Sequence, residues 1–378
     1  MSNKVPQIRF NGYSDAWEDR KFADFIDVKS GKDYKHLNSG SIPVYGTGGY
    51  MLSVDRALSD IDAIGLGRKG TIDKPYLLKA PFWTVDTLFY AVPKQNIDLQ
   101  FSLSIFKKIN WKKFDESTGV PSLSKTVINS VSVAVPSYEE QQKIGSFFKE
   151  LDNTLALHQS KLDLLKEQKK GYLQKMFPKN GEKVPELRFA GFADDWEERK
   201  FGELYKKVNE KNDLSFGKDR VISVANMYFK DTGNIRSDDA YMKTYNIFRT
   251  GDIAFEGNRS KHFSNGRFVE NTIGDGIVSH VFDVFRPIQQ FDLNYWKYAI
   301  HNERVMGPIL MTATTSSTMM TNLVAKDFLK RAILVPSYSE QKLVGSFFKQ
   351  LDDTIALHQS KLDLLKKQKK GYLQKMFV

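Results

Sequence analysis

The sequence predicts an α+β protein in which two globular α/β domains are separated by two long helices that form an antiparallel coiled coil. Three observations support this class. Two blocks of sequence occur twice, the stretches between them differ, and the longer repeated block has a heptad pattern of apolar residues. We therefore expect a tandem repeat whose halves are related by a pseudo-twofold axis.

The repeated blocks frame the chain. Residues Val5–Phe22 recur as Val184–Phe201, and Val135–Phe177 recur as Val335–Phe377 with 35 of 43 positions identical. The stretches between the blocks share little beyond their length. Duplication followed by drift is the plain alternative, but drift would not preserve the frames while erasing both inserts. We expect the repeated blocks to have the same function in both halves of the chain. We expect the two inserts to have functions of one kind that differ in detail.

The repeat divides the chain into four parts. We place a first domain with its box at 1–134 and a central long helix with its linker at 135–180. A second domain with the repeated box follows at 181–334, and a C-terminal long helix at 335–378. The linker is assigned to residues 178–183, where Pro stops a helix and Asn-Gly turns easily.

Each long helix begins after a Val-Pro-Ser start, and Glu139 and Glu140 stand where acids favour a helix N-terminus. About 38 residues follow, which is ~57 Å of helix. Neither helix can bury its apolar stripe alone, so we expect the two to pair; pairing with helices of other subunits is the alternative. The seam positions alternate three and four residues apart. They are Ile144, Phe148, Leu151, Leu155, His158, Leu162, Leu165, Lys169, Tyr172 and Met176, and in the copy Val344, Phe348, Leu351, Ile355, His358, Leu362, Leu365, Lys369, Tyr372 and Met376.

Two of these seam positions, His158 and His358, carry a polar ring. A polar seam residue fixes register at some cost in stability, and a metal site or pH switch is the less favoured interpretation. Each helix also carries a basic cluster, which we interpret as a solvated face that could contact phosphates. Its members are Lys166, Lys169, Lys170 and Lys175, and Lys366, Lys367, Lys369, Lys370 and Lys375.

Composition limits the classes of partner and compartment. The net charge is +11, which favours a polyanionic partner, either nucleic acid or an anionic membrane surface; a merely basic protein is the alternative. Because there is no cysteine, disulfides and thiolate metal sites are excluded. Residues 1–11 lack an apolar signal core, and no apolar run approaches the ~20 residues that span a membrane. We expect a soluble cytoplasmic protein.

Three short motifs occur in both halves of the chain. They are the box Arg-Phe-x-Gly-Phe/Tyr-x-Asp-x-Trp-Glu-x-Arg-Lys-Phe, the helix start Val-Pro-Ser-Tyr-x-Glu-Gln and the helix end Lys-Lys-Gly-Tyr-Leu-Gln-Lys-Met-Phe. The Glu-Gln pair falls at Glu140-Gln141 and Glu340-Gln341. Together these motifs resemble the specificity subunits of Type I restriction-modification systems, and the resemblance covers the whole chain, including the order of its parts.

The resemblance implies a function that composition alone cannot. In that family the two variable segments are target recognition domains, and each reads one half of a split, asymmetric DNA site. The helices form an antiparallel rod that docks two modification subunits, which carry the adenine-N6 methyltransferase chemistry. Restriction subunits with motor and nuclease activity join for cleavage. We expect this chain to be non-catalytic and without a cofactor, and S-adenosylmethionine to bind the methyltransferase subunits.

Both inserts contain short strand-like runs that lead into polar loops. The runs and loops are 42–50, 63–71, 82–90 and 117–121 in the first insert, and 255–267 and 312–318 in the second. Glycine allows close backbone approach to DNA, and Arg and Lys pair with guanine or phosphate. Ser and Thr hydroxyl groups can hydrogen-bond to either of these. For any one residue a solvated loop is the alternative. The candidate DNA-binding residues are Thr47, Gly48, Tyr50, Arg68, Lys69, Thr71, Ser117, Thr118, Asn258, Arg259, Ser260, Lys261, His262, Asn265, Thr314, Thr315 and Ser316.

Motifs for catalysis are weak in this chain. Gly65-x-Gly67-x-x-Gly70 matches the dinucleotide fingerprint, but Pro75 argues against the helix that must follow it. The tetrapeptide Ala80–Trp83 lacks the second Pro and the polar first residue of the amino-methyltransferase motif.

The sequence also contains no recognisable metal-binding or phosphate-binding motif. The sequence has no phosphate-binding Gly-x-x-x-x-Gly-Lys-Ser/Thr loop. The six histidines have no metal-ligand spacing, so we predict no metal site and interpret His280 and His301 as structural. A DNA-recognition subunit is the favoured interpretation. The alternatives are a nucleic-acid enzyme with an unrecognised site and a coiled-coil scaffold without a DNA role.

Overall fold

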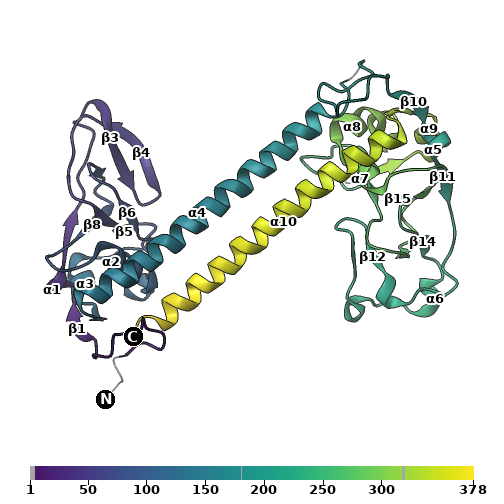
Figure 1. Ribbon diagram of the computed structural model, residues 1–378. Coiled ribbons are helices and arrows are strands. Elements are labelled where there is room, and N and C mark those ends of the chain that lie inside the picture. The colour runs from purple at the N-terminus through teal and green to yellow at the C-terminus, as the bar shows by residue number, and fades with distance from the viewer. Residues whose placement is uncertain (1–4, 180, 317–319) are drawn as a thin grey trace. The chain divides into compact units, whose positions relative to one another are not determined.

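The chain divides into two compact units in the computed structural model, which describes residues 5–179, 181–316 and 320–378. Unit 1 comprises Met1–Ser160 with His358–Val378, and unit 2 comprises Lys161–Leu357. The long helices α4 (Tyr138–Lys175) and α10 (Tyr338–Lys375) have 38 residues each, as predicted, and both pass from one unit into the other (Figure 1).

The α/β domain of unit 1 is built on a four-stranded antiparallel sheet in the order β2-β8-β5-β6. A second sheet, β4-β3-β7, carries the hairpin of β3 and β4, and β1 pairs with β9 just before α4 begins. The elements are β1 (Glu18–Lys21), α1 (Phe22–Phe25), β2 (Ile26–Ser30), β3 (Ser39–Gly46), β4 (Gly49–Val54), β5 (Ala63–Gly67), β6 (Tyr76–Leu78), β7 (Trp83–Thr84), β8 (Leu88–Pro93), α2 (Leu99–Lys108), the 3-10 helix Trp111–Phe114, α3 (Lys125–Ser130) and β9 (Ser132–Val135).

The α/β domain of unit 2 repeats the same frame. Its four-stranded antiparallel sheet has the order β11-β18-β15-β16, and β10 pairs with β21 just before α10. Its elements are β10 (Glu197–Lys200), α5 (Phe201–Leu204), β11 (Tyr205–Val208), the 3-10 helices Lys218–Arg220 and Thr232–Asn234, β12 (Ile222–Ser223), β13 (Tyr228–Phe229), α6 (Asp239–Met242), β14 (Asn246–Phe248), β15 (Ile253–Glu256), β16 (Arg267–Glu270), β17 (Gly276–Val278), β18 (Val284–Pro287), α7 (Leu293–His301), α8 (Glu303–Met311), β19 (Thr314–Ser316), β20 (Thr321–Leu323), α9 (Ala325–Lys330) and β21 (Ala332–Val335).

The repeated Lys-Met-Phe end of each long helix contributes an aromatic ring to the core of a domain. Phe377, directly after α10, packs edge-on against Trp17 of the first box at 6.1 Å and belongs to the core of unit 1. Phe177, directly after α4, makes the same 6.1 Å contact with Trp196 of the second box in unit 2. Burying such large apolar rings stabilises the join between helix and domain, which accounts for the repeated Lys-Met-Phe ending.

The helices pair antiparallel in both units, as predicted. In unit 1 the rings of Phe147 and Tyr372 lie 5.0 Å apart, and farther along α4 His158 meets His358. In unit 2 Tyr172 lies 5.0 Å from Phe347, so residue numbers rise on one helix as they fall on the other.

The predicted seam accounts for burial along both helices. Leu162 and Leu362 are each 1% exposed, and Leu165 and Leu365 are also buried. Leu157, which the heptad pattern leaves off the seam, is 70% exposed. The α+β class with an antiparallel helix pair is therefore confirmed. None of the helices in the described ranges is long and apolar enough to cross a membrane, and the predicted cytoplasmic location stays a prediction.

Two sequence expectations are wrong in detail. Residues 82–90 do not form one strand: β7 ends at Thr84 and β8 starts at Leu88, and the two strands belong to different sheets. Residues 312–318 are not all loop, because Thr314–Ser316 form β19 and pair with β20. Ser317 and Thr318, the last residues of that expected loop, lie outside the described residues.

Candidate nucleic-acid interface

The repeated Glu-Gln pair fixes each domain to the start of its long helix. Glu140 is 1% exposed and accepts two hydrogen bonds from Arg9 of the box, at 2.7 and 2.8 Å. This bidentate bond raises the pKa of the Arg9 guanidinium. The Gln141 amide donates to the carbonyl of Pro136 and accepts from the backbone N–H of Asp98, both at 3.0 Å. The carboxylate thus has a structural partner besides the helix N-terminus that the sequence suggested.

Unit 2 repeats this arrangement with its own residues. Arg188 donates to both carboxylate oxygens of Glu340 at 2.7 and 2.8 Å. Gln341 donates to the Pro336 carbonyl at 3.1 Å and accepts from the backbone N–H of Asp292 at 3.3 Å. Because both frames are locked in the same way, the differences between the domains lie in their loops and outer strands.

The first candidate loop of unit 1 is the turn between β3 and β4. Thr47 is half-buried and Gly48 is exposed at the turn itself. Tyr50, at the start of β4, is 64% exposed; its hydroxyl lies 3.2 Å from Ser53 Oγ and its ring stands edge-on to Tyr45. A large exposed aromatic ring held by its neighbours is suited to contact with a nucleic-acid surface.

The second candidate loop follows β5 and lies against the first. Arg68 and Lys69 are exposed and Thr71 is half-buried. A β-carbon placed on Gly70 would lie 3.9 Å from the hydroxyl of Thr47, so the two loops are neighbours. The guanidinium of Arg68 lies over the ring of Phe89 at 5.9 Å, and its Nη1 donates to the carbonyl of Asp86 at 3.4 Å.

The third candidate loop of unit 1 joins the second through its backbone. Gly70 N donates to the carbonyl of Pro121 at 2.8 Å, and Leu123 N donates to the carbonyl of Arg68 at 2.9 Å. The structure therefore brings all three predicted loops of unit 1 together.

Asp115 organises this third loop. It accepts hydrogen bonds from Ser122 N, Ser117 N and Ser117 Oγ at 2.8–3.0 Å, and the bond from Ser122 N contributes most to lowering its pKa. Ser117 is half-buried by these contacts, whereas Thr118 is exposed. Thr118 is therefore better placed than Ser117 to meet a ligand.

The glycines of the fingerprint-like motif serve the turn after β5. A β-carbon on Gly67 would lie 2.0 Å from the carbonyl oxygen of Thr71, and Gly70 has φ +88°. No helix follows: the next regular element is the strand β6. Both positions need glycine to fold the loop sharply back on itself. The motif builds the candidate interface and has no helix N-terminus to bind a dinucleotide.

The candidate loops of unit 2 also converge. The hairpin loop between β15 and β16 exposes Asn258, Arg259, Ser260, Lys261 and His262, whereas Asn265 is half-buried. Its base is tied to β20, because Thr321 N and Thr321 Oγ1 both donate to the carbonyl of Gly257, at 2.9 and 3.0 Å.

The second group of candidates in unit 2, Thr314–Ser316, lies in β19, next to the same strand β20. Thr314 is half-buried and its hydroxyl donates to the carbonyl of Leu310 at 2.7 Å, whereas Thr315 is exposed. Ser316 pairs with Thr321 across β19 and β20. The hairpin loop and the 314–316 strand therefore share β20 as a common neighbour.

An ion pair that sequence reasoning missed holds this hairpin. Glu256 is buried and accepts from Arg267 Nε at 2.7 Å, and Arg267 Nη2 donates to the carbonyl of Ala225 at 2.7 Å. The two residues face each other across β15 and β16, where opposite charges pair well. Their separation of eleven residues around a polar loop is a signal that could have suggested the pair.

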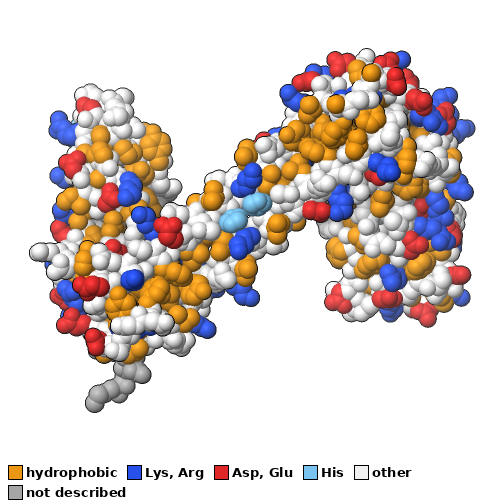
Figure 2. Space-filling model, in the orientation of Figure 1, with side chains coloured by type: hydrophobic (Ala, Val, Ile, Leu, Met, Phe, Trp, Pro, Cys, Tyr) orange, Lys and Arg blue, Asp and Glu red, His pale blue; other side chains and the backbone are white. Residues whose placement is uncertain are grey.

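The two seam histidines contact each other directly. His158 Nδ1 lies 3.1 Å from His358 Nδ1, so one ring donates and the other accepts. Two histidine side chains are visible next to each other on the paired helices in Figure 2. Within the described ranges, no group of three or more His, Asp or Glu side chains is arranged to hold a metal ion. His301 Nδ1–H donates to the carbonyl of Lys297 at 2.9 Å, and burial lowers the pKa of His301 to about 4.

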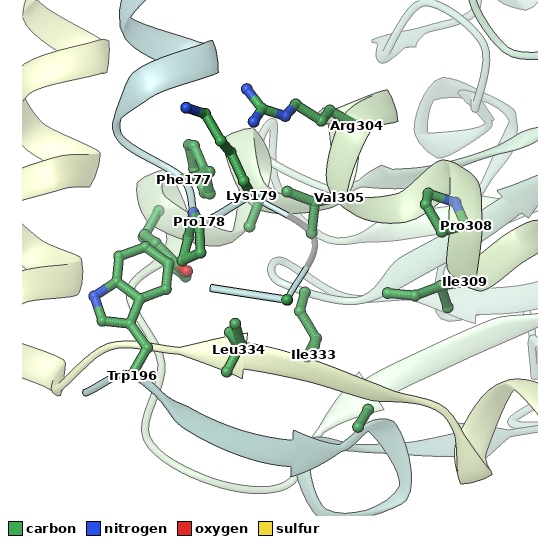
Figure 3. Close-up of a pocket in the computed structure, with 14 residues that line it drawn as sticks. Phe177, Pro178, Lys179, Trp196, Arg304, Val305, Pro308, Ile309, Ile333 and Leu334 are labelled. Atoms are coloured by element: carbon green, nitrogen blue, oxygen red, sulfur yellow. The ribbon is translucent and has the colours of Figure 1, made fainter. Parts of the chain in front are cut away.

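A cavity of about 150 Å³ lies at the end of α4, and Figure 3 shows residues that line it. Val305 and Ile309 of α8 line one side, Ile333 and Leu334 of β21 line another, and Pro178 of the linker closes it. Among the described residues that line it, only Lys179 and Arg304 are charged. The described lining is mainly apolar packing beside the linker and includes no group of catalytic side chains.

The comparison with known proteins finds the same two repeats. A family model described as the Type I restriction modification DNA specificity domain matches residues 14–167 and again 193–367. The chain is 21% identical over 335 residues to the Type I restriction enzyme MjaVIII specificity subunit of Methanocaldococcus jannaschii, covering 82% of this chain and 74% of that protein. A putative MjaX type I restriction enzyme specificity subunit of the same organism is 21% identical over 276 residues, and the match covers 62% of that protein.

Solved structures share the fold over almost the whole chain. The S subunit of a Type I restriction-modification system from M. genitalium superposes with a TM-score of 0.67 and 16% identity, covering 99% of both chains. A chain from a structural study of complex assembly and conformational transition in the type I R-M system gives a TM-score of 0.50 at 12% identity, covering 95% and 97%. At these identities the likeness concerns the fold.

Proposed function

The chain belongs to the Type I restriction-modification DNA specificity family, and we propose that it selects the DNA sequence on which separate enzyme subunits act. DNA sequence recognition is the role of this family. We propose further that the site is bipartite and asymmetric, and that each unit reads one half of it through its converging loops.

One observation carries this proposal: the frames of the two units are alike and their outer parts are not. Both units have a four-stranded sheet of the same order and the same Arg–Glu clamp. Beyond the frame, unit 1 has the three-stranded sheet β4-β3-β7, whereas unit 2 has the small sheets β12-β13 and β14-β17. A protein that recognises two different half-sites needs two similar domains that carry different DNA-contacting surfaces.

The chemistry then belongs to other subunits. We propose that the long helices dock two methyltransferase subunits, which bind S-adenosylmethionine and methylate adenine at N6, and that restriction subunits join them for cleavage. Exposed leucines on the helices, such as Leu157, Leu164, Leu357 and Leu364, support a docking role because they lie off the seam. The proposed role of this chain is to position the complex on DNA without a catalytic group or cofactor of its own.

Exchange of one insert tests the proposal. Residues 24–134 are replaced by the corresponding insert of another family member, the chain is expressed with its methyltransferase partner, and methylated motifs are mapped by sequencing. We expect one half of the motif to change and the other half to stay. The matched exchange of residues 203–334 should change the opposite half. If either exchange alters both halves together, the modular proposal is wrong.

A further inference from the structure

Unit 2 contains a basic cleft of about 800 Å³ between α4, α7, the start of α8 and the β15–β16 hairpin loop. We call it the helix–hairpin cleft. Six lysine and arginine side chains line it against two carboxylates, Glu303 and Asp352. The basic cluster of α4 and the predicted DNA-contacting hairpin, which lie about 100 residues apart in the sequence, therefore face the same space.

Half of these cations hold the walls of the cleft together. Lys169 bonds Asp352 of α10 at 2.5 Å, and the same carboxylate accepts from Tyr298 of α7 at 2.7 Å. Arg304 donates to the carbonyl of Gln174 at 2.7 Å, which ties α8 to α4. Arg267 is engaged by Glu256. These bonds fix the shape of the cleft.

The other cations are left available to a ligand. Lys166 has no carboxylate at ion-pair distance within the described parts of the chain, and both Lys166 and Lys170 are exposed. The ammonium groups of Lys170 and Lys297 are 4.0 Å from their nearest carboxylates, the limit of an ion pair. A row of under-neutralised ammonium groups in a preformed cleft favours a polyanion.

The hairpin side indicates which polyanion fits. His262 and Phe263 line the cleft, and Ser260 and Phe263 exchange backbone hydrogen bonds of 3.1 and 3.3 Å that order the tip. Arg259 and Lys261, on the same tip, are exposed. A duplex that touches this tip therefore has its backbone beside the ammonium groups of α4. Lys166 and Lys170 are one helical turn apart, ~6 Å, which corresponds to about two charges along one DNA strand.

We propose that the helix–hairpin cleft holds the sugar-phosphate backbone of DNA bound by unit 2, with Lys166 and Lys170 as phosphate contacts. The inference rests on the proposed DNA-recognition function and adds two contacts on α4, outside the reading loops. Phosphate contacts position a protein on the duplex without selecting bases. Removing them weakens binding to every sequence and leaves the recognised motif unchanged.

The test compares the full chain with the Lys166→Ala, Lys170→Ala double variant. Affinity is measured against salt concentration on a duplex carrying the mapped motif and on a scrambled duplex of the same composition. The log–log slope should fall by about 1.8, or about 0.9 for each lost phosphate contact. The affinity loss should be the same on both duplexes. The Lys326→Ala, Lys330→Ala variant removes two charges from α9 of the same unit, outside the cleft, and should keep the parent slope.

Each failure has its own signature. If the parent chain shows no preference for the motif duplex, the proposed function fails. If the parent prefers it and the double variant keeps the parent slope, the cleft does not hold the backbone. A variant that keeps the slope but loses its methyltransferase partner on co-purification would make the cleft a protein-docking site. A changed methylation motif would make the two lysines base readers, which also overturns the proposal.

Discussion

Arg9 and Glu140, which are 131 positions apart, form a bidentate ion pair with both N···O distances below 3 Å. Arg188 and Glu340 form the same pair in the second unit. Each arginine belongs to a box before a domain and each glutamate to the first turn of the helix after it. The pair therefore joins the box at the start of each domain to the helix that follows the domain. The carboxylate of each pair is shielded from water.

Replacing Arg9 by Ala should destabilise unit 1 by roughly 3 kcal/mol, because Glu140 would remain buried without its counter-ion. Urea unfolding of the full chain measures the loss. Arg188→Ala should cost a similar amount in unit 2. The control is Arg56→Ala, which removes an exposed arginine and should change the midpoint little. An Arg9→Ala protein as stable as the parent would show that the pair contributes nothing.

Truncation of the seam should also be costly. Leu162→Ala removes a side chain that is 1% exposed and should lower the free energy of unfolding by about 2–5 kcal/mol. Leu157→Ala, on the same helix but 70% exposed, is the control and should cost far less. Methylation in cells should fail for the Leu162 variant before the motif changes. A stable Leu162→Ala protein with an altered motif would contradict the assignment of the seam to structure.

The seam could be predicted because it depends on local periodicity. Alternating spacings of three and four residues identified Leu162 and Leu362 as buried, and the structure agrees. The Arg9–Glu140 pair could not be predicted in the same way, because nothing local to either residue indicates a partner so far along the chain. The doubled Glu-Gln motif marked the right residues without giving their role.

The candidate loops could be predicted in part: the sequence identified the loops but not that they come together. Turn residues placed Thr47, Lys69 and Thr118 on loops, but their common location depends on backbone bonds such as Gly70 N to Pro121 O. Glu270 could not be predicted at all. It pairs with Ile253 in β15–β16, whereas Leu77 pairs with Ile64 at the matching place in β5–β6. No sequence pattern identifies a carboxyl group in a position suited to leucine.

This buried carboxyl group should give unit 2 a pH-dependent stability. Burial raises the pKa of Glu270 well above its usual value, so the folded state keeps a proton that the unfolded chain loses above pH ~4.5. Stability from this group is thus full below pH ~4.5 and falls as pH rises. Glu270→Gln should remove a slope of up to about 1.4 kcal/mol per pH unit, measured as urea midpoints against pH.

A second buried group in unit 2 acts in the opposite direction. Burial lowers the pKa of His301 to about 4, so its contribution is full above pH ~6.5 and is lost as pH falls toward 4. The two slopes oppose each other between pH ~4.5 and ~6.5. Glu270→Gln should therefore make stability rise with pH across that window. The exposed Glu198→Gln is the control, and a Glu270→Gln profile parallel to the parent would mean that Glu270 is ionised in the folded state.

The reading loops should show phosphate contact through salt dependence. Neutralising Lys69 in unit 1 or Lys261 in unit 2 should reduce the slope of log affinity against log salt by about one unit if the side chain touches phosphate. Both side chains are exposed, so the substitutions should not affect folding. Binding of the full chain to its motif duplex measures the slope, and an unchanged slope would assign that lysine to solvent.

The last prediction concerns the spacing of the two half-sites. Both long helices pass between the units, α4 after Ser160 and α10 after Leu357. A copy of residues 154–160 inserted at the first point and of 351–357 at the second lengthens each helix by one heptad, so the apolar stripe keeps its face. The contacts inside each unit are unchanged. If the helix pair sets the gap, ~10 Å of added helix should widen it by about three base pairs.

A four-residue insertion at the same two points is the graded comparison. It adds ~6 Å, or one to two base pairs, but turns the stripe away from its partner, so part of the gain should be lost along with some activity. Methylation sequencing reads both variants directly. Unchanged spacing with retained methylation would mean that the helices do not set the gap. Changed half-site bases would mean that the helices take part in readout, because neither insertion alters a recognition loop.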